Sequence, residues 1–104
     1  MNIDAIAKEK IDEWFTEWTM LEAQIHAAHD ARNGEAKGLM ERAIMLFERL
    51  VSEAGEEVMP LNGNERMDFI KTKPGQYACY RQLDELFKET KKRTARLRLQ
   101  AAKG

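Results

Sequence analysis

The sequence predicts an all-α protein, folded as an elongated up-down-up bundle of three long helices with one short helix before the last of them. Its 104 residues suit one domain, and 43% of them are apolar, which is enough for a core. Two prolines, six glycines and a single serine leave few turn residues for a β-sandwich or barrel. In three long stretches the apolar residues recur at alternating spacings of three and four, the period of an amphipathic helix. We therefore expect a single helical domain over residues 1–104.

The first long helix is expected from about residue 3 to residue 32. One apolar stripe runs along it at spacings of four and three. The members of this stripe are Ala7, Ile11, Trp14, Trp18, Leu21, Ile25 and Ala28. Asn33 and Gly34 follow, and glycine suits the left-handed conformation that ends many helices.

The second long helix is expected over about residues 35–59. It carries two adjacent apolar stripes, one through Met40, Ile44, Phe47, Val51, Ala54 and Val58, and one through Leu39, Ala43, Leu46 and Leu50. Two adjacent stripes make a broad apolar face, so this helix should contact more than one neighbour. Pro60 and the run Asn62-Gly63-Asn64 should end it.

The segment between Pro60 and Gly75 is too long for a tight turn and contains apolar residues that a solvated loop would not need. We expect a short helix over about residues 65–71, capped by Asn64, that closes one end of the bundle. The third long helix is expected over about residues 76–101. Its stripe runs through Tyr80, Leu83, Phe87, Thr90, Thr94, Leu97 and Ala101 at spacings of three and four.

The lengths of these helices also predict self-association. At about 1.5 Å per residue, each long helix would extend roughly 40 Å, which is long for a chain of this size. A bundle this slender leaves much of its wide apolar faces uncovered, and sustained three-four spacing also pairs helices of different chains. We therefore expect a homo-oligomer, most simply a two-fold homodimer.

The formal net charge of −1 hides a strong gradient along the chain. Residues 88–104 carry a net charge of +6, whereas residues 1–87 carry −7. In an up-down-up bundle this basic end lies at the opposite pole from the acidic start of the first helix. Bases near a helix end complement the helix dipole, or they bind an anionic partner, which is either an acidic protein surface or a nucleic-acid backbone. The candidate residues are Lys91, Lys92, Arg93, Arg96 and Arg98.

Three aromatic residues near the start of the chain are candidates for a protein interface. Trp14 and Trp18 lie on the apolar stripe of the first helix, whereas Phe15 lies about 100° away on the helix surface. Aromatic side chains are enriched where protein surfaces meet. Either all three belong to the core, or they form a contact patch with a second chain.

Two histidines are the weak candidates for a metal site. His26 and His29 are three residues apart on one helix, with Glu22 and Asp30 nearby, a spacing that ligands on one helix can use. Carboxylate-bridged metal bundles instead use Glu-x-x-His motifs, and this sequence has none. We therefore expect no metal and no cofactor.

Residues for catalysis are few. Ser52 and Cys79 are the only serine and cysteine, and each falls within a predicted helix without an adjacent base. Glu53, Glu56 and Glu57 resemble solvated helix-end charges more than an acid and base set. No Gly-rich phosphate loop is present. The sequence therefore predicts that the protein is not an enzyme.

The remaining features concern location and partners. The chain opens with charged residues through position 13, so we expect no secretory signal. Its longest strictly apolar run covers residues 43–47, far short of the roughly 20 residues that span a bilayer. A lone cysteine indicates a reducing, cytoplasmic location without a membrane partner.

Together these patterns favour a small regulatory protein that binds another protein as a homodimer: an adaptor, an inhibitor or an accessory factor. The alternative is a nucleic-acid-associated regulator that binds phosphates through the basic C-terminal helix.

Overall fold

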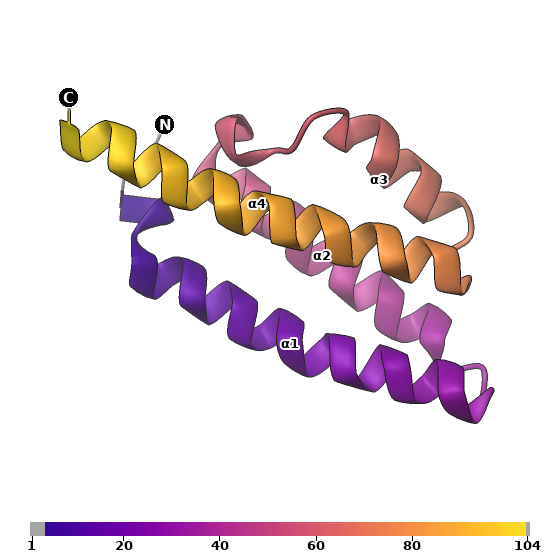
Figure 1. Ribbon diagram of the computed structural model, residues 1–104. Coiled ribbons are helices and arrows are strands. Elements are labelled where there is room, and N and C mark those ends of the chain that lie inside the picture. The colour runs from indigo at the N-terminus through magenta and orange to yellow at the C-terminus, as the bar shows by residue number, and fades with distance from the viewer. Residues whose placement is uncertain (1–3, 104) are drawn as a thin grey trace.

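The computed structural model describes residues 4–103, which form four α-helices and no strand. The helices are α1 (Lys8–Ala31), α2 (Ala36–Ala54), α3 (Gly63–Thr72) and α4 (Tyr77–Lys103). Two single-turn 3-10 helices, η1 (Asp4–Ile6) and η2 (Glu56–Val58), precede α1 and follow α2. The molecule measures 49 × 25 × 17 Å, with its three long helices along the longest direction (Figure 1). The all-α prediction is confirmed, although the predicted helix start at Ile3 lies outside the described residues.

The predicted up-down-up order of the three long helices is wrong, because α4 runs antiparallel to α1 and in the same direction as α2 (Figure 1). Near the start of α4, the Tyr80 hydroxyl donates a hydrogen bond to Glu22, which lies late in α1. Near the end of α4, Arg98 donates a hydrogen bond to the carbonyl oxygen of Ile6, before α1 begins. Residue numbers therefore rise along α4 as they fall along α1.

The segment between α2 and α4 explains this direction. Instead of closing one end of the bundle, η2 and α3 carry the chain back along its length (Figure 1). Gly75, just before α4, lies beside the start of α2: a Cβ atom placed on Gly75 would be 3.4 Å from the Cβ atom of Lys37. Consequently α2 and α4 start at the same end, and the basic end of α4 lies beside the acidic start of α1 rather than at the opposite pole.

Backbone conformation sets the ends of the helices. After α1, Arg32 is left-handed and Gly34 has a φ of 77°, as expected of a glycine stop. The second helix ends at Ala54 rather than near residue 59, because Gly55 takes a φ of 104° that interrupts helical geometry. At the start of α3, the cap is Asn62, with a φ of 56°, and not Asn64 as predicted.

The buried stripe of α1 differs from the prediction at two positions, of which the first, Ala7, is partly buried and lies just before the helix. Phe15 and Trp18 are 9% and 4% exposed, whereas Trp14 is only partly buried and packs against the edge of the core. The reason is that α1 packs against two helices, so its buried face points between them. Phe15 packs against Phe87 of α4, and the guanidinium of Arg49 in α2 lies 5.6 Å from the ring centre of Trp14.

The broad apolar face predicted for α2 is present and contacts more than one neighbour, since α2 packs against α1, α3 and α4. Its buried residues are Ala36, Met40, Ala43, Ile44, Leu46, Phe47, Leu50 and Ala54. Because other helices of the same chain cover this face, it no longer argues for a dimer. Within residues 4–103, no helix is both long enough and apolar enough to cross a membrane.

An ion pair ties α3 to α4. The guanidinium of Arg66 donates two hydrogen bonds to the carboxylate of Glu89, with N–O distances of 3.0 and 2.6 Å. This contact lowers the pKa of Glu89, because the guanidinium favours the charged carboxylate. The short helix is thereby fixed on the long one.

Two threonines lie on the buried side of α4. Thr90 and Thr94 are both fully buried. The Thr94 hydroxyl donates to the carbonyl oxygen of Lys91 at 2.8 Å, whereas the Thr90 hydroxyl has no hydrogen-bond partner in the described structure. A buried polar group without a partner costs roughly 1–3 kcal/mol of desolvation. Thr90 is therefore a weak point in the core.

Replacing Thr90→Val should raise the free energy of unfolding by about 1 kcal/mol, because valine keeps the shape and removes the unpaired hydroxyl. Thr94→Val, one helical turn further on, is the matched control and should gain less because it also removes a hydrogen bond. Urea denaturation followed by circular dichroism measures both changes. A Thr90→Val chain that is no more stable than the Thr94→Val chain would contradict this assignment.

Candidate functional site

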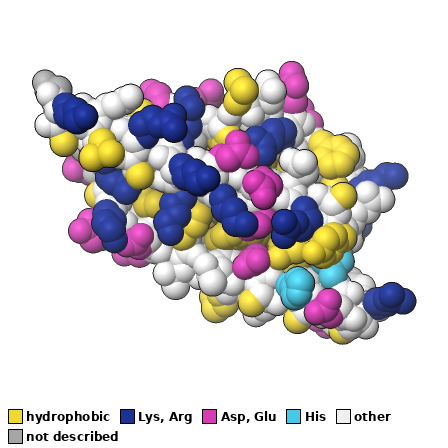
Figure 2. Space-filling view, viewed as in Figure 1, with side chains coloured by type: hydrophobic (Ala, Val, Ile, Leu, Met, Phe, Trp, Pro, Cys, Tyr) yellow, Lys and Arg dark blue, Asp and Glu magenta, His cyan; other side chains and the backbone are white. Residues whose placement is uncertain are grey.

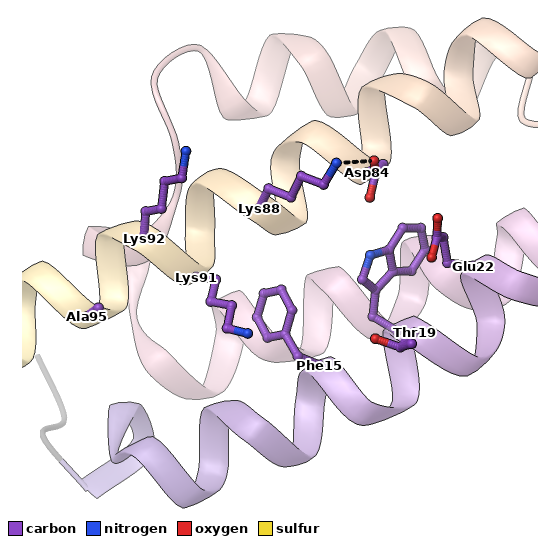
Figure 3. Close-up of a pocket in the computed structure, with 9 residues that line it drawn as sticks. Phe15, Thr19, Glu22, Asp84, Lys88, Lys91, Lys92 and Ala95 are labelled. Carbon is purple, nitrogen blue, oxygen red and sulfur yellow. Dashed lines mark ion pairs between the residues drawn. The ribbon is translucent and has the colours of Figure 1, made fainter.

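A hollow of about 510 Å³ lies between α1 and α4 (Figure 3). We call it the α1–α4 groove. Its lining residues are Phe15, Trp18, Thr19 and Glu22 from α1, and Asp84, Lys88, Lys91, Lys92 and Ala95 from α4. Thr19 and Ala95 are small, so the two helices do not fill the space between them on this side of the bundle.

Aromatic rings form the base of the groove and are held from below. The Trp18 ring stacks on Phe87, with 4.2 Å between ring centres and 12° between planes. Phe15 meets Phe87 edge-on at 5.8 Å, and Phe87 in turn meets Phe47 of α2 edge-on at 5.1 Å. Such pairs contribute about 0.5–1.5 kcal/mol each beyond burial of area. The base of the groove is therefore a fixed surface.

At one end of the groove, the carboxylates already have partners. The Lys88 ammonium lies 2.9 Å from the Asp84 carboxylate, whose side chain is 6% exposed, and this contact raises the pKa of Lys88. The Tyr80 hydroxyl donates to Glu22 at 2.9 Å. Burial, reinforced by that carboxylate, raises the pKa of Tyr80. This end is electrostatically satisfied.

The other end of the groove carries two ammonium groups without an ion-pair partner among residues 4–103. The Lys91 side chain reaches toward the groove and its Nζ atom lies 5.2 Å from the centre of the Phe15 ring (Figure 3). Lys92 is exposed and points away from α1. Lys91 therefore places positive charge beside the aromatic base, and Lys92 adds positive charge at the outer edge of the groove.

The groove continues along α1. A second hollow of about 340 Å³ is lined by Asp12, Phe15, Thr16, Thr19 and Lys91. It shares Phe15, Thr19 and Lys91 with the first hollow. The two hollows therefore adjoin beside α1, and their lining residues extend from Asp12 to Glu22.

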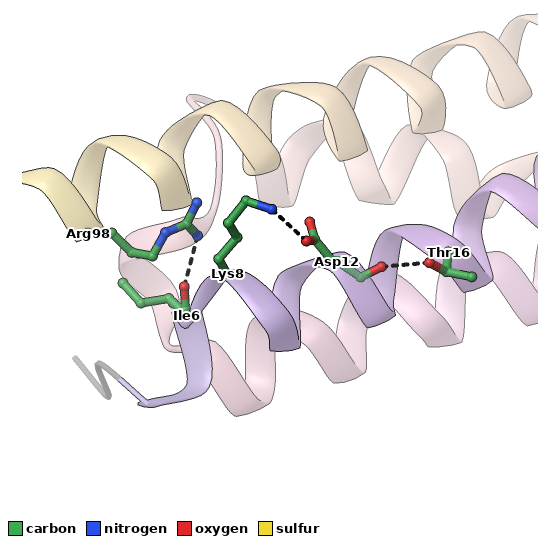
Figure 4. A network of polar contacts seen from close by, with 5 residues as sticks. All are labelled: Ile6, Lys8, Asp12, Thr16 and Arg98. Atoms are coloured by element: carbon green, nitrogen blue, oxygen red, sulfur yellow. Dashed lines mark hydrogen bonds and ion pairs between the residues drawn. The ribbon is translucent and has the colours of Figure 1, made fainter.

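Two of the five basic residues predicted to bind an anion also donate hydrogen bonds to backbone carbonyl groups. Arg98 donates a hydrogen bond to the carbonyl oxygen of Ile6 at 2.8 Å (Figure 4). Arg93 donates to the carbonyl oxygen of Glu57, at the 3-10 turn η2. Both arginines therefore anchor the last turns of α4 to the rest of the chain.

The other three predicted basic residues remain available to a ligand. Lys91 and Lys92 line the groove. Lys92 and Arg96 also line a smaller hollow of about 220 Å³ beside Pro60 and Leu61. Figure 2 shows basic side chains gathered along α4, where Lys88, Lys92 and Arg96 are exposed at intervals of four residues.

Of the three predicted interface aromatics, Phe15 and Trp18 lie at the base of the groove, whereas Trp14 lies outside its lining. Sequence reasoning missed Thr19, Asp84, Lys88 and Ala95, and it named Glu22 only beside the candidate metal-ligating histidines. The spacing of Asp84 and Lys88, four residues apart with opposite charge, was a readable signal for an ion pair on one helix. No signal in the sequence placed α4 antiparallel to α1.

The two histidines lie away from the groove lining. His26 has its Nε2 atom 3.5 Å from an Asp30 carboxylate oxygen. His29 packs against Tyr77 and Tyr80, with ring centres 5.3 and 6.0 Å apart. Within residues 4–103, no three side chains of His, Cys, Asp or Glu are grouped so as to hold a metal ion.

The remaining candidates for catalysis do not come together in the fold. Cys79 is fully buried, its thiol lies 3.9 Å from the carbonyl oxygen of Phe69, and burial raises its pKa. Ser52 is exposed on α2. The exposed glutamates Glu53, Glu56 and Glu57 lie in the last turn of α2 and in η2.

These features define a small all-α protein with an open, lysine-rimmed groove between its first and last long helices. Residues 8–102 match the protein family described as YpoC-like protein, and the chain belongs to this family.

A related protein of Bacillus subtilis (strain 168) is described as "Uncharacterized protein YpoC". It is 58% identical to this chain over 33 residues, which are 32% of this chain and 20% of the Bacillus protein. The match thus spans a fifth of that relative's length. No solved structure matches the chain.

Replacing Arg98→Met should lower the free energy of unfolding by about 1 kcal/mol, because it removes a charged donor from a backbone carbonyl. Arg96→Met is the matched control on the same turn of α4. Its side chain is exposed and forms no hydrogen bond in the described structure, so its effect should stay within about 0.5 kcal/mol. Urea midpoints report both values, and equal losses would show that Arg98 is not an anchor.

Proposed function

We propose that this protein is a non-enzymatic helical interaction protein whose α1–α4 groove binds a partner protein. The observation that carries the proposal is a fixed aromatic base, Phe15 and Trp18, next to the unpaired ammonium groups of Lys91 and Lys92. Buried aromatic anchors with a charged rim are typical of protein interfaces. In this role the protein acts as an adaptor, an inhibitor or an accessory factor in the cytoplasm.

The homodimer expected from the sequence stays a prediction. Apolar side chains that a second copy would cover are exposed on several helices and loops: Met20, Met45, Leu61, Phe69, Tyr77 and Leu99. The wide face of α2 is covered within the chain, so a dimer would have to use these side chains or the groove itself.

A photo-crosslinking amino acid at position 19 should capture a partner protein in cells of the source organism, because Thr19 is exposed and lines the groove. The same amino acid at position 24 is the control, since Gln24 is exposed on α1 but lies outside the groove lining. Gel shift and mass spectrometry of the adducts identify the partner.

The mass of the crosslinked adduct shows whether the captured molecule is a different protein or a second copy of this chain. An adduct at position 19 with a different protein, absent at position 24, supports the proposal. An adduct of twice the 12.0 kDa chain mass would show a second copy at the groove and support the homodimer. Equal capture at both positions, or none at position 19, would sink a protein-binding groove.

The alternative function is binding of a nucleic-acid backbone by α4, favoured by the exposed row of Lys88, Lys92 and Arg96. A duplex bound through phosphates should dissociate steeply as salt rises, because counterions are released on binding. Fluorescence anisotropy with labelled duplex and single-stranded DNA, from 20 to 200 mM salt as rough limits, measures this. Lys92→Glu/Arg96→Glu should weaken such binding at least tenfold, and no binding at low salt would eliminate this alternative.

A further inference from the structure

We propose that the α1–α4 groove receives an amphipathic helix of a partner protein, with apolar side chains on Phe15 and Trp18 and acidic side chains facing Lys91 and Lys92. This inference rests on the proposed protein-binding function and specifies the chemistry of the partner. Helix-in-groove docking uses apolar anchors spaced at i, i+3, i+4 and i+7, so the expected occupant has a recognisable sequence pattern.

The elongated arrangement of the two hollows suits a helix better than a compact ligand. The hollows of about 510 and 340 Å³ adjoin along α1, with lining residues from Asp12 to Glu22. At 1.5 Å per residue, that length is about 15 Å, nearly three helical turns. Small side chains on both walls, Thr19 and Ala95, leave room for an element that lies between α1 and α4.

The base of the groove is organised before any partner arrives. Trp18 and Phe15 are held by contacts of 4.2 and 5.8 Å to the ring of Phe87, which is itself fully buried. A surface that does not have to be ordered on binding avoids part of the entropic cost of association. The rings are therefore suited to act as anchors for apolar side chains of a docked helix.

The charges of the groove select an acidic occupant. Lys88 is already paired with Asp84, and Glu22 accepts a hydrogen bond from Tyr80. Lys91 and Lys92 form no direct ion pair within residues 4–103, and the Lys91 ammonium lies 5.2 Å from the centre of the Phe15 ring. Weaker electrostatic interactions join Lys91 to Asp12 and Lys92 to Glu89. Carboxylates on a docked helix would form ion pairs with these two ammonium groups. At the other end of the groove, the Glu22 carboxylate would repel them. The acidic part of the partner helix should therefore lie over Lys91 and Lys92.

This predicts the outcome of a selection from a displayed library of random 16-residue helical peptides against the purified full-length chain. Enriched peptides should combine apolar residues at i, i+3, i+4 and i+7 with Asp or Glu beside them. A synthetic copy of the most enriched peptide then serves as the probe in isothermal titration.

Matched variants locate the binding of that probe. Lys91→Glu/Lys92→Glu should weaken it at least tenfold, whereas Lys10→Glu/Lys103→Glu makes the same change in net charge away from the groove and should leave it unchanged. Thr19→Trp fills the groove and should abolish binding, with Gln24→Trp as the neutral control. Circular dichroism and urea midpoints check folding, and Thr19→Arg replaces Thr19→Trp if the latter chain is unfolded.

Several results would overturn the inference. These are selected peptides without an excess of acidic residues, no enrichment at all, or an affinity unchanged by Lys91→Glu/Lys92→Glu. Self-association that Thr19→Trp abolishes would show that a second copy occupies the groove instead. Capture at position 19 is measured separately from the peptide selection. A captured partner combined with a failed selection would therefore support the proposed function and contradict only the inference that the partner docks through an acidic helix.

Discussion

The rest of this structure depends on the ring of Phe87. It is fully buried and meets Phe15 and Trp18 of α1 on one side and Phe47 of α2 on another, so all three long helices converge on one side chain. The contacts that hold α1 against α4 are the same contacts that fix the base of the groove. The same aromatic contacts therefore stabilise the bundle and set the geometry of the candidate site.

Periodicity in the sequence was enough to predict the existence and approximate bounds of the helices. Apolar spacing of three and four marks a helix with one buried face, and it does not depend on which neighbour covers that face. It did not predict the direction of α4. The stretch from Pro60 to Gly75 is compatible with closing one end of the bundle or with returning along its length, and only packing of α3 decides between them. The break at Gly55 was hidden because Val58 continues the apolar stripe.

The candidate site was named in parts but not assembled. Phe15, Trp18, Lys91 and Lys92 were all singled out, the first two as a protein contact and the others as an anion site. Joining them required the antiparallel pairing of α1 with α4, which also lets Arg93 and Arg98 donate hydrogen bonds to backbone carbonyl groups. Of the five predicted basic residues, Arg93 and Arg98 thus contact the backbone of other segments, whereas Lys91 and Lys92 line the groove and Arg96 is exposed.

The hydrogen bond from Arg98 to Ile6 joins residues that are 92 positions apart, so it holds the start and the end of the described chain together. Figure 1 shows both described ends at the same end of the bundle, while the exposed turn at Asn33 and Gly34 lies at the other. Such a topology is suited to circular permutation: a short linker between the present ends would let the backbone be opened at that turn with its core contacts unchanged.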